Sequence, residues 1–458
     1  MSTNGAPLLP AAVVQVETAF PAFIGYTQKA ITQTAAVTLV PVIIGSMSDY
    51  IRVFGGPENE KNMEVLVSTG AVAETHITIQ FAAGKTACKH NMYYALQMFF
   101  ANGGGPCYII SVGASSSAGV IDPLQLKKGL DVLQNEDAPS IIVFPEAVQG
   151  LQDAAYAVLI AQILQQCATL RDQFVVLDVK TNDTLTIAEN AAAFRSLVNG
   201  SAGLMSYGAA YFPNLKTAIP YFFSDADIRV TDRRTATATV STLAAIQQSQ
   251  PPLYQQIKKE LNGFCVDIPP ASAVAGVYVS TDRDRGVWKA PANKALNNIR
   301  GPRVKIGERD SENLNIDPLA GKSINPLREF IGKGTLVWGA RTLAGNDNEW
   351  RYVSVRRFFM MVEESVKKAT LQFVFEPNDR NTWTKVMIII QDYLVILWRQ
   401  GALTGMRPAD AFYVKTGLGI TMTAIDVLNG LLIVEIGMAA IRPAEFIIFR
   451  FSQKMQQA

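Results

Sequence analysis

The feature that most constrains the fold is a regular alternation of strand-like and helix-like segments over residues 120–216. Strands are predicted at Ser140–Pro145, Phe174–Val179 and Gly208–Phe212, and helices at Pro123–Gln134, Leu151–Arg171 and Ile187–Val198. Strands that alternate with helices of this length favour a mainly parallel sheet connected by crossover helices. The sequence therefore predicts an α/β domain in this part of the chain.

The flanking regions add further strands and helices, so the fold class is mixed α/β. Upstream, Lys89–Phe100 has the apolar spacing of a helix and precedes a strand at Cys107–Val112. Downstream, the segment Gly301–Lys322 is rich in charge, proline and glycine and is interpreted as a surface loop. The last third contains predicted helices at Val353–Ala369 and Trp383–Trp398 and terminal strands at Leu431–Ile441 and Phe446–Phe451. A chain of 458 residues has room for about three domains.

Composition excludes several classes of protein. With 49% hydrophobic and 17% charged residues the chain is too apolar to be disordered, and a net charge of +2 predicts no strong attraction to nucleic acid. Its four cysteines are far apart and form no Cys-x-x-Cys pair, which argues against a disulfide framework or a thiolate metal site. No apolar run is long enough to span a bilayer, and the first ten residues do not resemble a secretory signal.

Catalytic candidates are few. Asp178 and Asp183 lie at and beyond the end of a predicted parallel strand, where α/β enzymes often place functional groups, so a hydrolase or phosphatase using Asp178 is the alternative function. Lys85 lies in a Gly-Lys-Thr sequence, but Ile79 stands where a phosphate-binding loop needs its first glycine. Neither histidine, His76 or His90, has a nucleophile motif nearby. We expect no cofactor and no bound metal.

The Trp383–Trp398 helix is apolar almost all round, which predicts burial on every side in a subunit core or an assembly interface. From Lys322 onward the chain has 17 Lys and Arg against 12 Asp and Glu, although it is nearly neutral as a whole. This basic bias could face an acidic partner, or it could be scatter over a solvated surface.

A series of motifs in the second half resembles the contractile tail sheath family of phages and phage-tail-like injection systems. In order they are Gly276-Val277-Tyr278, Arg285-Gly286-Val287-Trp288, Ile324-Asn325-Pro326-Leu327-Arg328, Val337-Trp338-Gly339-Ala340-Arg341, Glu349-Trp350-Arg351-Tyr352, Phe375-Glu376-Pro377-Asn378, Gly401-Ala402-Leu403-Thr404-Gly405 and Arg442-Pro443-Ala444-Glu445-Phe446. The first half agrees more loosely, at Phe20–Thr27, Phe54-Gly55-Gly56 and Phe99–Gly104. Many sheaths begin with a Pro-Gly-Val-Tyr run, whereas this chain has Ala6-Pro7-Leu8-Leu9-Pro10 there.

The resemblance implies a structural protein and no enzyme. Sheath subunits of this family stack as hexameric rings around an inner tube, and the homo-oligomer contracts to drive the tube through a target membrane. The expected partners are further copies of the chain, the inner tube protein, and baseplate and terminal cap proteins, with no nucleic acid and no direct membrane insertion. Assembly in the bacterial cytoplasm is expected, within a phage virion or a released or membrane-anchored particle.

The family also implies a domain plan. The predicted parts are an N-terminal arm (1–18), a discontinuous inner domain (19–119 and 322–443), an inserted α/β outer domain (120–321) and a C-terminal arm strand (444–458). The terminal arms would add strands to neighbouring subunits. The arm residues expected to do so are Val13, Val14, Val16, Phe446, Ile448 and Phe451. Basic side chains around the Trp383–Trp398 helix are the candidates to face the tube: Arg380, Lys385, Arg399 and Arg407.

Overall fold

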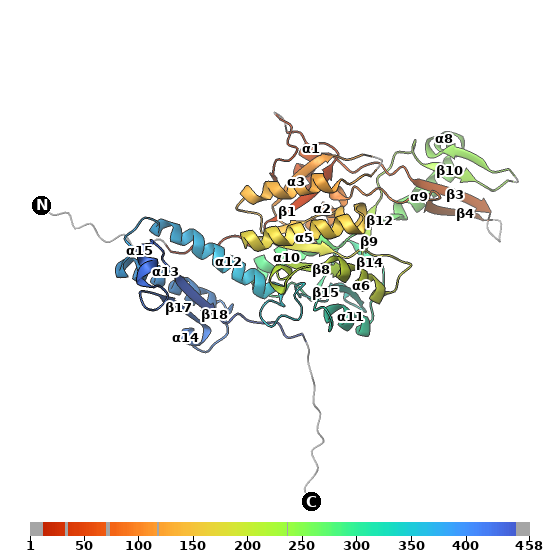
Figure 1. Ribbon diagram of the computed structural model, residues 1–458. Helices are drawn as coiled ribbons and strands as arrows, with labels where there is room; N and C mark the ends of the chain where they lie inside the picture. Colours follow the sequence, from red (N-terminus) through yellow and green to blue (C-terminus); the bar gives the residue numbers. More distant parts are fainter. Residues whose placement is uncertain (1–11, 33–34, 70–73, 117–118, 236, 446–458) are drawn as a thin grey trace, which may run out of the picture. The chain divides into compact units, whose positions relative to one another are not determined.

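The computed structural model describes residues 12–32, 35–69, 74–116, 119–235 and 237–445 (Figure 1). The chain divides into two compact units. The large unit comprises Val16–Val287 and Pro291–Met361, and the small unit comprises Met1–Gln15, Trp288–Ala290 and Val362–Ala458. The boundary between Met361 and Val362 falls within helix α12 (Val353–Thr370). No helix in the described ranges has the length and apolar character needed to cross a membrane.

A nine-stranded sheet forms the centre of the large unit. Its spatial order is β13 (Lys294–Ala295), β16 (Gly334–Val337), β15 (Ile324–Phe330), β8 (Gly208–Phe212), β7 (Phe174–Asp178), β6 (Ile141–Val143), β1 (Pro21–Thr27), β5 (Cys107–Ala114) and β2 (Val42–Ile44). The six strands from β15 to β5 are parallel, whereas β2, β16 and β13 pair in the antiparallel sense. Strands β1, β6, β7 and β8 are buried along their whole length, as expected of a parallel sheet covered on both faces.

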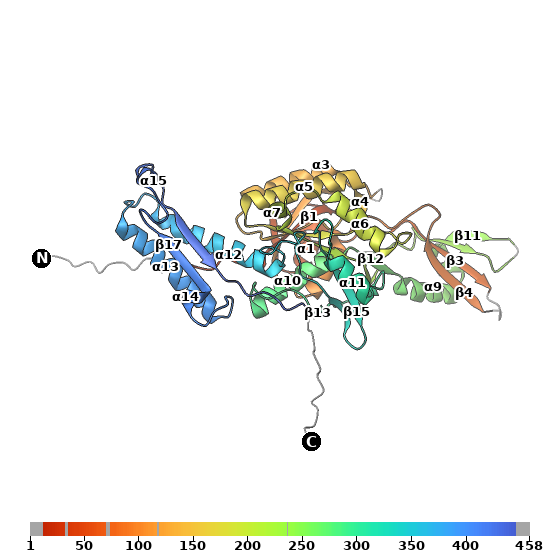
Figure 2. The same cartoon turned by 60° about the horizontal axis from the view of Figure 1, so that its bottom comes forward.

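Helices cover both faces of this sheet. Adjacent residues of β1 demonstrate this, because successive side chains in a strand point to opposite faces. Ile24 packs against Gly129 of α3 (Pro123–Val132), whereas a side chain at Gly25 would collide with Met92 of α2 (Met92–Ala101). Helix α5 (Asp153–Leu170) packs beside α3, and α10 (Ala271–Arg285) packs beside α2. Figure 2 shows α3 and α5 on the side of the sheet opposite to α10.

Helices α2 and α10 approach each other unusually closely. A Cβ atom at Gly276 of α10 would lie 2.5 Å from the carbonyl oxygen of Phe99, so only glycine fits there. At the end of α2, Gly103 has φ = +93°, a conformation that glycine adopts without strain and that turns the chain toward β5. Asn102 continues this contact by accepting a hydrogen bond from Asn297 N at 2.8 Å.

Two smaller sheets complete the large unit. One has the order β11 (Thr239–Thr242), β10 (Arg229–Asp232), β3 (Met63–Thr69) and β4 (Thr75–Phe81), and the other has the order β12 (Cys265–Ile268), β9 (Leu215–Pro220) and β14 (Ile299–Pro302). The remaining helices are α1 (Met47–Phe54), η1 (Leu133–Asn135), α4 (Ala147–Gly150), α6 (Ile187–Leu197), α7 (Ala202–Met205), α8 (Leu243–Ser249), α9 (Pro251–Gly263) and α11 (Glu308–Asn315).

The described part of the small unit is a helical layer with a two-stranded sheet. It contains the end of α12, η2 (Leu371–Phe373), α13 (Arg380–Arg399), α14 (Pro408–Ala411), β17 (Phe412–Thr416), α15 (Ala424–Leu428) and β18 (Val434–Met438). Strands β17 and β18 are antiparallel, with Val414 opposite Ile436. Helix α13 is capped at its N-terminus by Asp379, whose side chain accepts a hydrogen bond from Thr382 N at 3.0 Å.

Most predicted elements are present, and strand pairing crosses the boundaries of the predicted domain plan. Strands β1 and β5, from the predicted inner domain, pair with each other, and β1 also pairs with β6 from the predicted outer domain. The boundaries expected after residues 119 and 321 therefore lie within one sheet, because long-range strand pairing joins segments that local composition separates. The expected loop at 301–322 also contains a helix, α11, whose first turn carries Glu308 and Asp310.

Candidate functional site

Asp178, the principal catalytic candidate, is a buried structural acceptor. It ends β7, and its carboxylate accepts a hydrogen bond of 2.7 Å from the backbone N–H of Ala271, the first residue of α10. Burial raises the pKa of this carboxyl group to about 8, although the hydrogen bond from Ala271 acts in the opposite direction. Asp178 therefore joins the end of a strand to the start of a helix.

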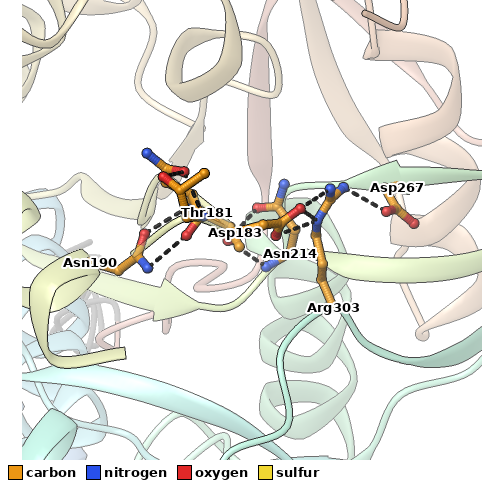
Figure 3. Close-up of polar contacts among 8 residues, drawn as sticks. Thr181, Asp183, Asn190, Asn214, Asp267 and Arg303 are labelled. Carbon is orange, nitrogen blue, oxygen red and sulfur yellow. Dashed lines mark hydrogen bonds and ion pairs between the residues drawn. The ribbon is translucent and has the colours of Figure 1, made fainter. Parts of the chain in front are cut away.

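Asp183, the second candidate, is held by an arginine instead (Figure 3). Arg303 donates from Nε to Asp183 Oδ1 at 2.9 Å and from Nη1 to Asp267 Oδ2 at 2.7 Å. The hydrogen bond from Arg303 lowers the pKa of Asp183, whereas burial raises the pKa of Asp267. The bridge ties the loop after β7 to β12, and Asn214 N donates to Thr181 Oγ1 at 3.0 Å beside it.

The two aspartates thus have separate partners, and no hydrogen bond or ion pair links them in the ranges that the structure describes. Within those ranges, no group of three or more His, Cys, Asp or Glu residues is arranged to hold a metal ion. The arrangement does not support the hydrolase alternative, because neither carboxylate is free to act on a substrate with the other.

The histidines and cysteines are placed as structural residues. His90 is buried with its Nδ1 3.5 Å from Glu146 Oε1, and Glu146 accepts a hydrogen bond of 2.9 Å from Tyr26 N. His76 lies on β4. All four cysteines are free thiols. None of these residues forms a recognisable nucleophile–base pair.

A buried ion pair contacts the chain at Thr18, the last residue of the predicted N-terminal arm. Arg357 of α12 binds Asp282 of α10 through two contacts, of 3.0 and 2.6 Å, and both side chains are 3% exposed. The same guanidinium donates to the carbonyl oxygen of Thr18 at 2.6 Å, and Thr18 Oγ1 donates to Asp282 at 2.8 Å. Tyr278 lies beneath the guanidinium, 5.0 Å from ring centroid to Cζ.

The sequence predicts the ion-pair cluster around Arg357 and Asp282 only in part. The density of charge around Arg283–Lys289 and Glu349–Arg357 predicts ion pairing but does not reveal which partners meet. The informative signal is the position of Arg357 on α12 beside apolar residues such as Phe358, which is fully buried. A charge on an apolar helix face needs a buried partner.

In the single chain the Trp383–Trp398 helix is not buried on every side, so of the two predicted settings, a subunit core and an assembly interface, a subunit core does not account for it. Helix α13 buries one face, which includes Val386, Ile389, Tyr393 and Leu397. Its other face is open, with Ile388 45% and Ile396 51% exposed. Apolar side chains therefore lie on both the core face and the outer face of this helix, and the outer ones are available to another molecule.

Exposed apolar side chains are concentrated in the small unit. The structure records 28 exposed large hydrophobic residues in its described ranges, and 13 of them lie between 362 and 445. They are Leu371, Val374, Phe375, Ile388, Ile396, Met406, Tyr413, Leu418, Ile420, Ile425, Leu428, Leu431 and Ile433. A surface this apolar is typical of a protein–protein interface.

The four basic candidates are all exposed, and one of them is already paired. Arg407 contacts Asp410 at 3.2 Å. For Arg380, Lys385 and Arg399, no ion pair exists with any residue in the described ranges. Among the four, Arg407 therefore has a local acidic partner.

The predicted arm residues are only partly within the described ranges. Val13, Val14 and Val16 lie in a segment without helix or strand, and Val14 is 78% exposed. Phe446, Ile448 and Phe451 lie outside the described residues.

Comparisons with known proteins match this architecture. Residues 345–454 match the phage tail sheath C-terminal domain family. A tail sheath protein of Vibrio phage KVP40 is 27% identical over 140 residues, which cover 31% of this chain and 21% of the phage protein. The matched region thus spans about a fifth of the length of that curated relative.

Solved structures extend the match over the whole chain. The sheath of the PVC extracellular contractile injection system in its contracted state is 28% identical, with a TM-score of 0.68 over 99% of this chain and 97% of that chain. The chain is similar to contractile tail sheath proteins over nearly its whole length. A chain of the contracted anti-feeding prophage baseplate is also similar, at 26% identity and a TM-score of 0.70 over 98% of this chain and 97% of that one. The sheath fold therefore accounts for both units and not only for the C-terminal region.

Proposed function

We propose that the chain is the structural subunit of a contractile sheath. Copies of it would polymerise as stacked hexameric rings around an inner tube and contract to drive the tube through a target membrane. The observation that carries this proposal is the likeness to a contracted sheath subunit over 99% of the chain. The particle would be a phage or a phage-tail-like injection system with a baseplate and a terminal cap, assembled in the bacterial cytoplasm.

Assembly would depend on strands exchanged between subunits. Strands β17 and β18 form a two-stranded sheet, and among the described residues no third strand pairs with either outer edge. A two-stranded sheet is only marginally stable alone, and an open edge accepts an added strand. Terminal segments containing Val13, Val14, Val16, Phe446, Ile448 and Phe451 would supply such strands to a neighbouring subunit.

The small unit would face the tube. Arg380, Lys385 and Arg399 present charge around α13 and have no acidic partner within the described ranges, so they are free to pair with an acidic tube wall. Each exposed pair contributes about 0.2–1 kcal/mol, and repetition along the particle makes such weak contacts sufficient. Weak contacts also let the sheath leave the tube during contraction.

The sheath would do mechanical work without catalysis. The energy would be stored in the extended lattice and released on contraction, so no bond needs to be hydrolysed. Asp178, whose Oδ1 accepts a hydrogen bond from Ala271 N, has no catalytic task in this scheme. Contraction of purified particles that required added nucleotide would contradict it.

The decisive experiment is negative-stain microscopy of the purified chain and of a variant lacking residues 446–458. We expect the full chain to form long tubes and the truncated chain to remain folded, by circular dichroism, but unassembled. Normal tubes from the truncated chain would contradict strand exchange through this arm. A monomer that hydrolyses esters or phosphates and never polymerises would contradict the sheath proposal itself.

A further inference from the structure

A cavity of about 590 Å³ lies at the carboxyl ends of three parallel strands in the large unit. Its lining includes Gln149, which follows β6, Lys180 and Thr181, which follow β7, and Asn214, which follows β8. In open α/β sheets, ligands bind in the crevice beyond these strand ends. The volume also falls within the range of about 300–1,000 Å³ that small-molecule sites occupy.

The strand order places this cavity near a change in winding direction. The chain runs from β1 to β5 on one side and then crosses back to β6, β7 and β8 on the other. Such a reversal leaves a natural opening between the connections, because they leave the sheet in opposite directions. Gln149, next to the β6 end, and Asn91, directly before α2, both line the cavity and hydrogen bond to each other.

The lining is strongly basic. Six cationic side chains border the cavity: Lys85, Lys89, Lys180, Lys216, Arg300 and Arg303. Asp267 is the single acidic residue that the structure places in the lining. The six cations come from four separate stretches of sequence, so the fold itself, and not a local basic run, brings them together.

Internal ion pairs neutralise only two of the six. Lys180 contacts Asp153 at 2.8 Å, and Arg303 is shared between Asp183 and Asp267. Arg300 donates to the carbonyl oxygen of Gly263 at 2.8 Å. Lys85, Lys89 and Arg300 have no acidic partner within the described ranges. Lys216 forms no ion pair there, although its charge acts to lower the pKa of Asp183 and Asp267. Convergent like charges repel one another, and a bound anion relieves that repulsion.

The cavity also has an apolar wall. The rings of Phe81, Tyr221 and Phe264 pack together with centroids 5.5–5.7 Å apart, and all three residues line the space. Backbone pairing holds part of the basic wall in place, because Lys216 of β9 lies opposite Gly301 of β14. The site is therefore a framed pocket with an aromatic side and a cationic side.

We propose that this cavity binds a small, multiply charged oxyanion, a phosphate ester or a polycarboxylate, through Lys85, Lys89, Lys216 and Arg300. The site differs from a phosphate-binding loop, because Lys85 N is engaged in a turn with the carbonyl oxygen of Ala82 at 2.8 Å. Recognition would rest on side-chain charge instead of backbone N–H groups. The inference is independent of the sheath proposal, since it depends only on the large unit.

Isothermal titration calorimetry on the full-length chain tests this proposal, with sodium pyrophosphate and sodium citrate as separate probes. We expect saturable binding of at least one of them at 50 mM salt, weakened at 300 mM salt because charge carries the contact. The Lys85→Gln/Lys216→Gln double variant should weaken that binding at least tenfold. Pyrophosphate binding without citrate binding would assign the phosphate class, and the reverse would assign the carboxylate class.

The matched control is Lys259→Gln, which removes an exposed positive charge of α9 that is not part of the cavity lining. It should bind the probe as the unmodified chain does, and circular dichroism should show that all variants are folded. Absence of saturable binding of both probes, equal weakening in the control, or binding of an oligoglutamate peptide in place of the small anions would overturn the proposal.

Discussion

The two units differ in how completely each satisfies its own apolar surface. The large unit buries a continuous core around its parallel sheet, with residues such as Phe23, Phe99 and Phe174 fully inaccessible. The small unit exposes 13 large apolar side chains over residues 362–445 and pairs only two strands. The difference indicates that the large unit covers most of its apolar surface internally, whereas the small unit leaves much of its apolar surface available to other molecules.

Breaking the buried ion pair should give the largest loss of folding stability. Replacing Asp282 by Ala leaves Arg357 without a counter-charge at a site 3% exposed, which costs about 3–5 kcal/mol. Denaturant unfolding measures this loss. The control is Arg283→Ala, which removes an exposed pair with Asp284 and should leave stability unchanged. Equal stability of the two variants would mean that the large unit does not depend on this pair.

Two adjacent isoleucines of α13 distinguish folding from assembly within the small unit. Ile389 is 4% exposed, so Ile389→Ala should lower stability by about 2–5 kcal/mol. Ile388 is 45% exposed, so Ile388→Ala should leave unfolding nearly unchanged but reduce the yield of tubes. Urea denaturation and electron microscopy provide the two measurements. Tubes formed normally by Ile388→Ala would show that this face of α13 is not an interface.

The buried Asp178 should make the folding stability of the large unit depend on pH. Its pKa is raised to about 8 in the folded chain, above the unfolded value of 3.8. Its favourable contribution to stability is therefore complete below the unfolded pKa, falls steadily as pH rises between the two values, and is gone above the folded pKa. Asp178→Asn removes that loss. Relative to the unmodified chain, this variant should gain up to about 1.4 kcal/mol of stability per pH unit between pH 5 and pH 7.

Unfolding at several pH values, with Asp183→Asn as the control, checks this expectation. The pKa of Asp183 is lowered by Arg303, so its variant should lose stability at neutral pH instead of gaining it. A pH-independent difference between Asp178→Asn and the unmodified chain would contradict an uncharged, buried Asp178.

Charge reversal on the small unit should have the smallest effect per residue. Lys385→Glu should weaken assembly around the tube at low salt, because it places a negative charge against an acidic tube wall. The effect should be small, because each exposed pair contributes only about 0.2–1 kcal/mol. Arg407→Glu serves as the comparison, since Arg407 already contacts Asp410 and should matter less for the tube. Co-assembly with the inner tube protein, against polymerisation of the sheath alone, measures the difference. Unaltered assembly around the tube for Lys385→Glu would remove this residue from the interface.

Local patterns predicted the elements of the large unit well but not their arrangement. Strand Gly208–Phe212 was predicted with its observed bounds, and helices Ile187–Leu197 and Asp153–Leu170 were predicted within two residues at each end. Their periodicity is a local property, so sequence alone reveals it. The pairing of β1 with both β5 and β6 depends on contacts between distant segments, which local patterns do not reveal.

The small unit shows a second limit of sequence-based prediction, which concerns the exposure of apolar side chains. An apolar residue in α13 has the same sequence signature whether it faces the core, as Ile389 does, or the outside, as Ile388 does. Hydrophobicity predicts that a side chain avoids water but not which molecule covers it. The tail sheath resemblance was informative here because it supplied the assembly that the pattern itself could not specify.

The contacts at Thr18 have a mechanical consequence. Strand β1 begins at Pro21, three residues after Thr18, and lies between parallel neighbours on both sides. A pull on the preceding segment directed along β1 would load its hydrogen bonds to β5 and β6 together, in shear, instead of opening them one at a time. The Arg357–Asp282 pair grips Thr18 just ahead of that strand and would take up part of the load first. The segment between Thr18 and β1 should therefore resist tension, because the ion pair and the strand hydrogen bonds would share the load.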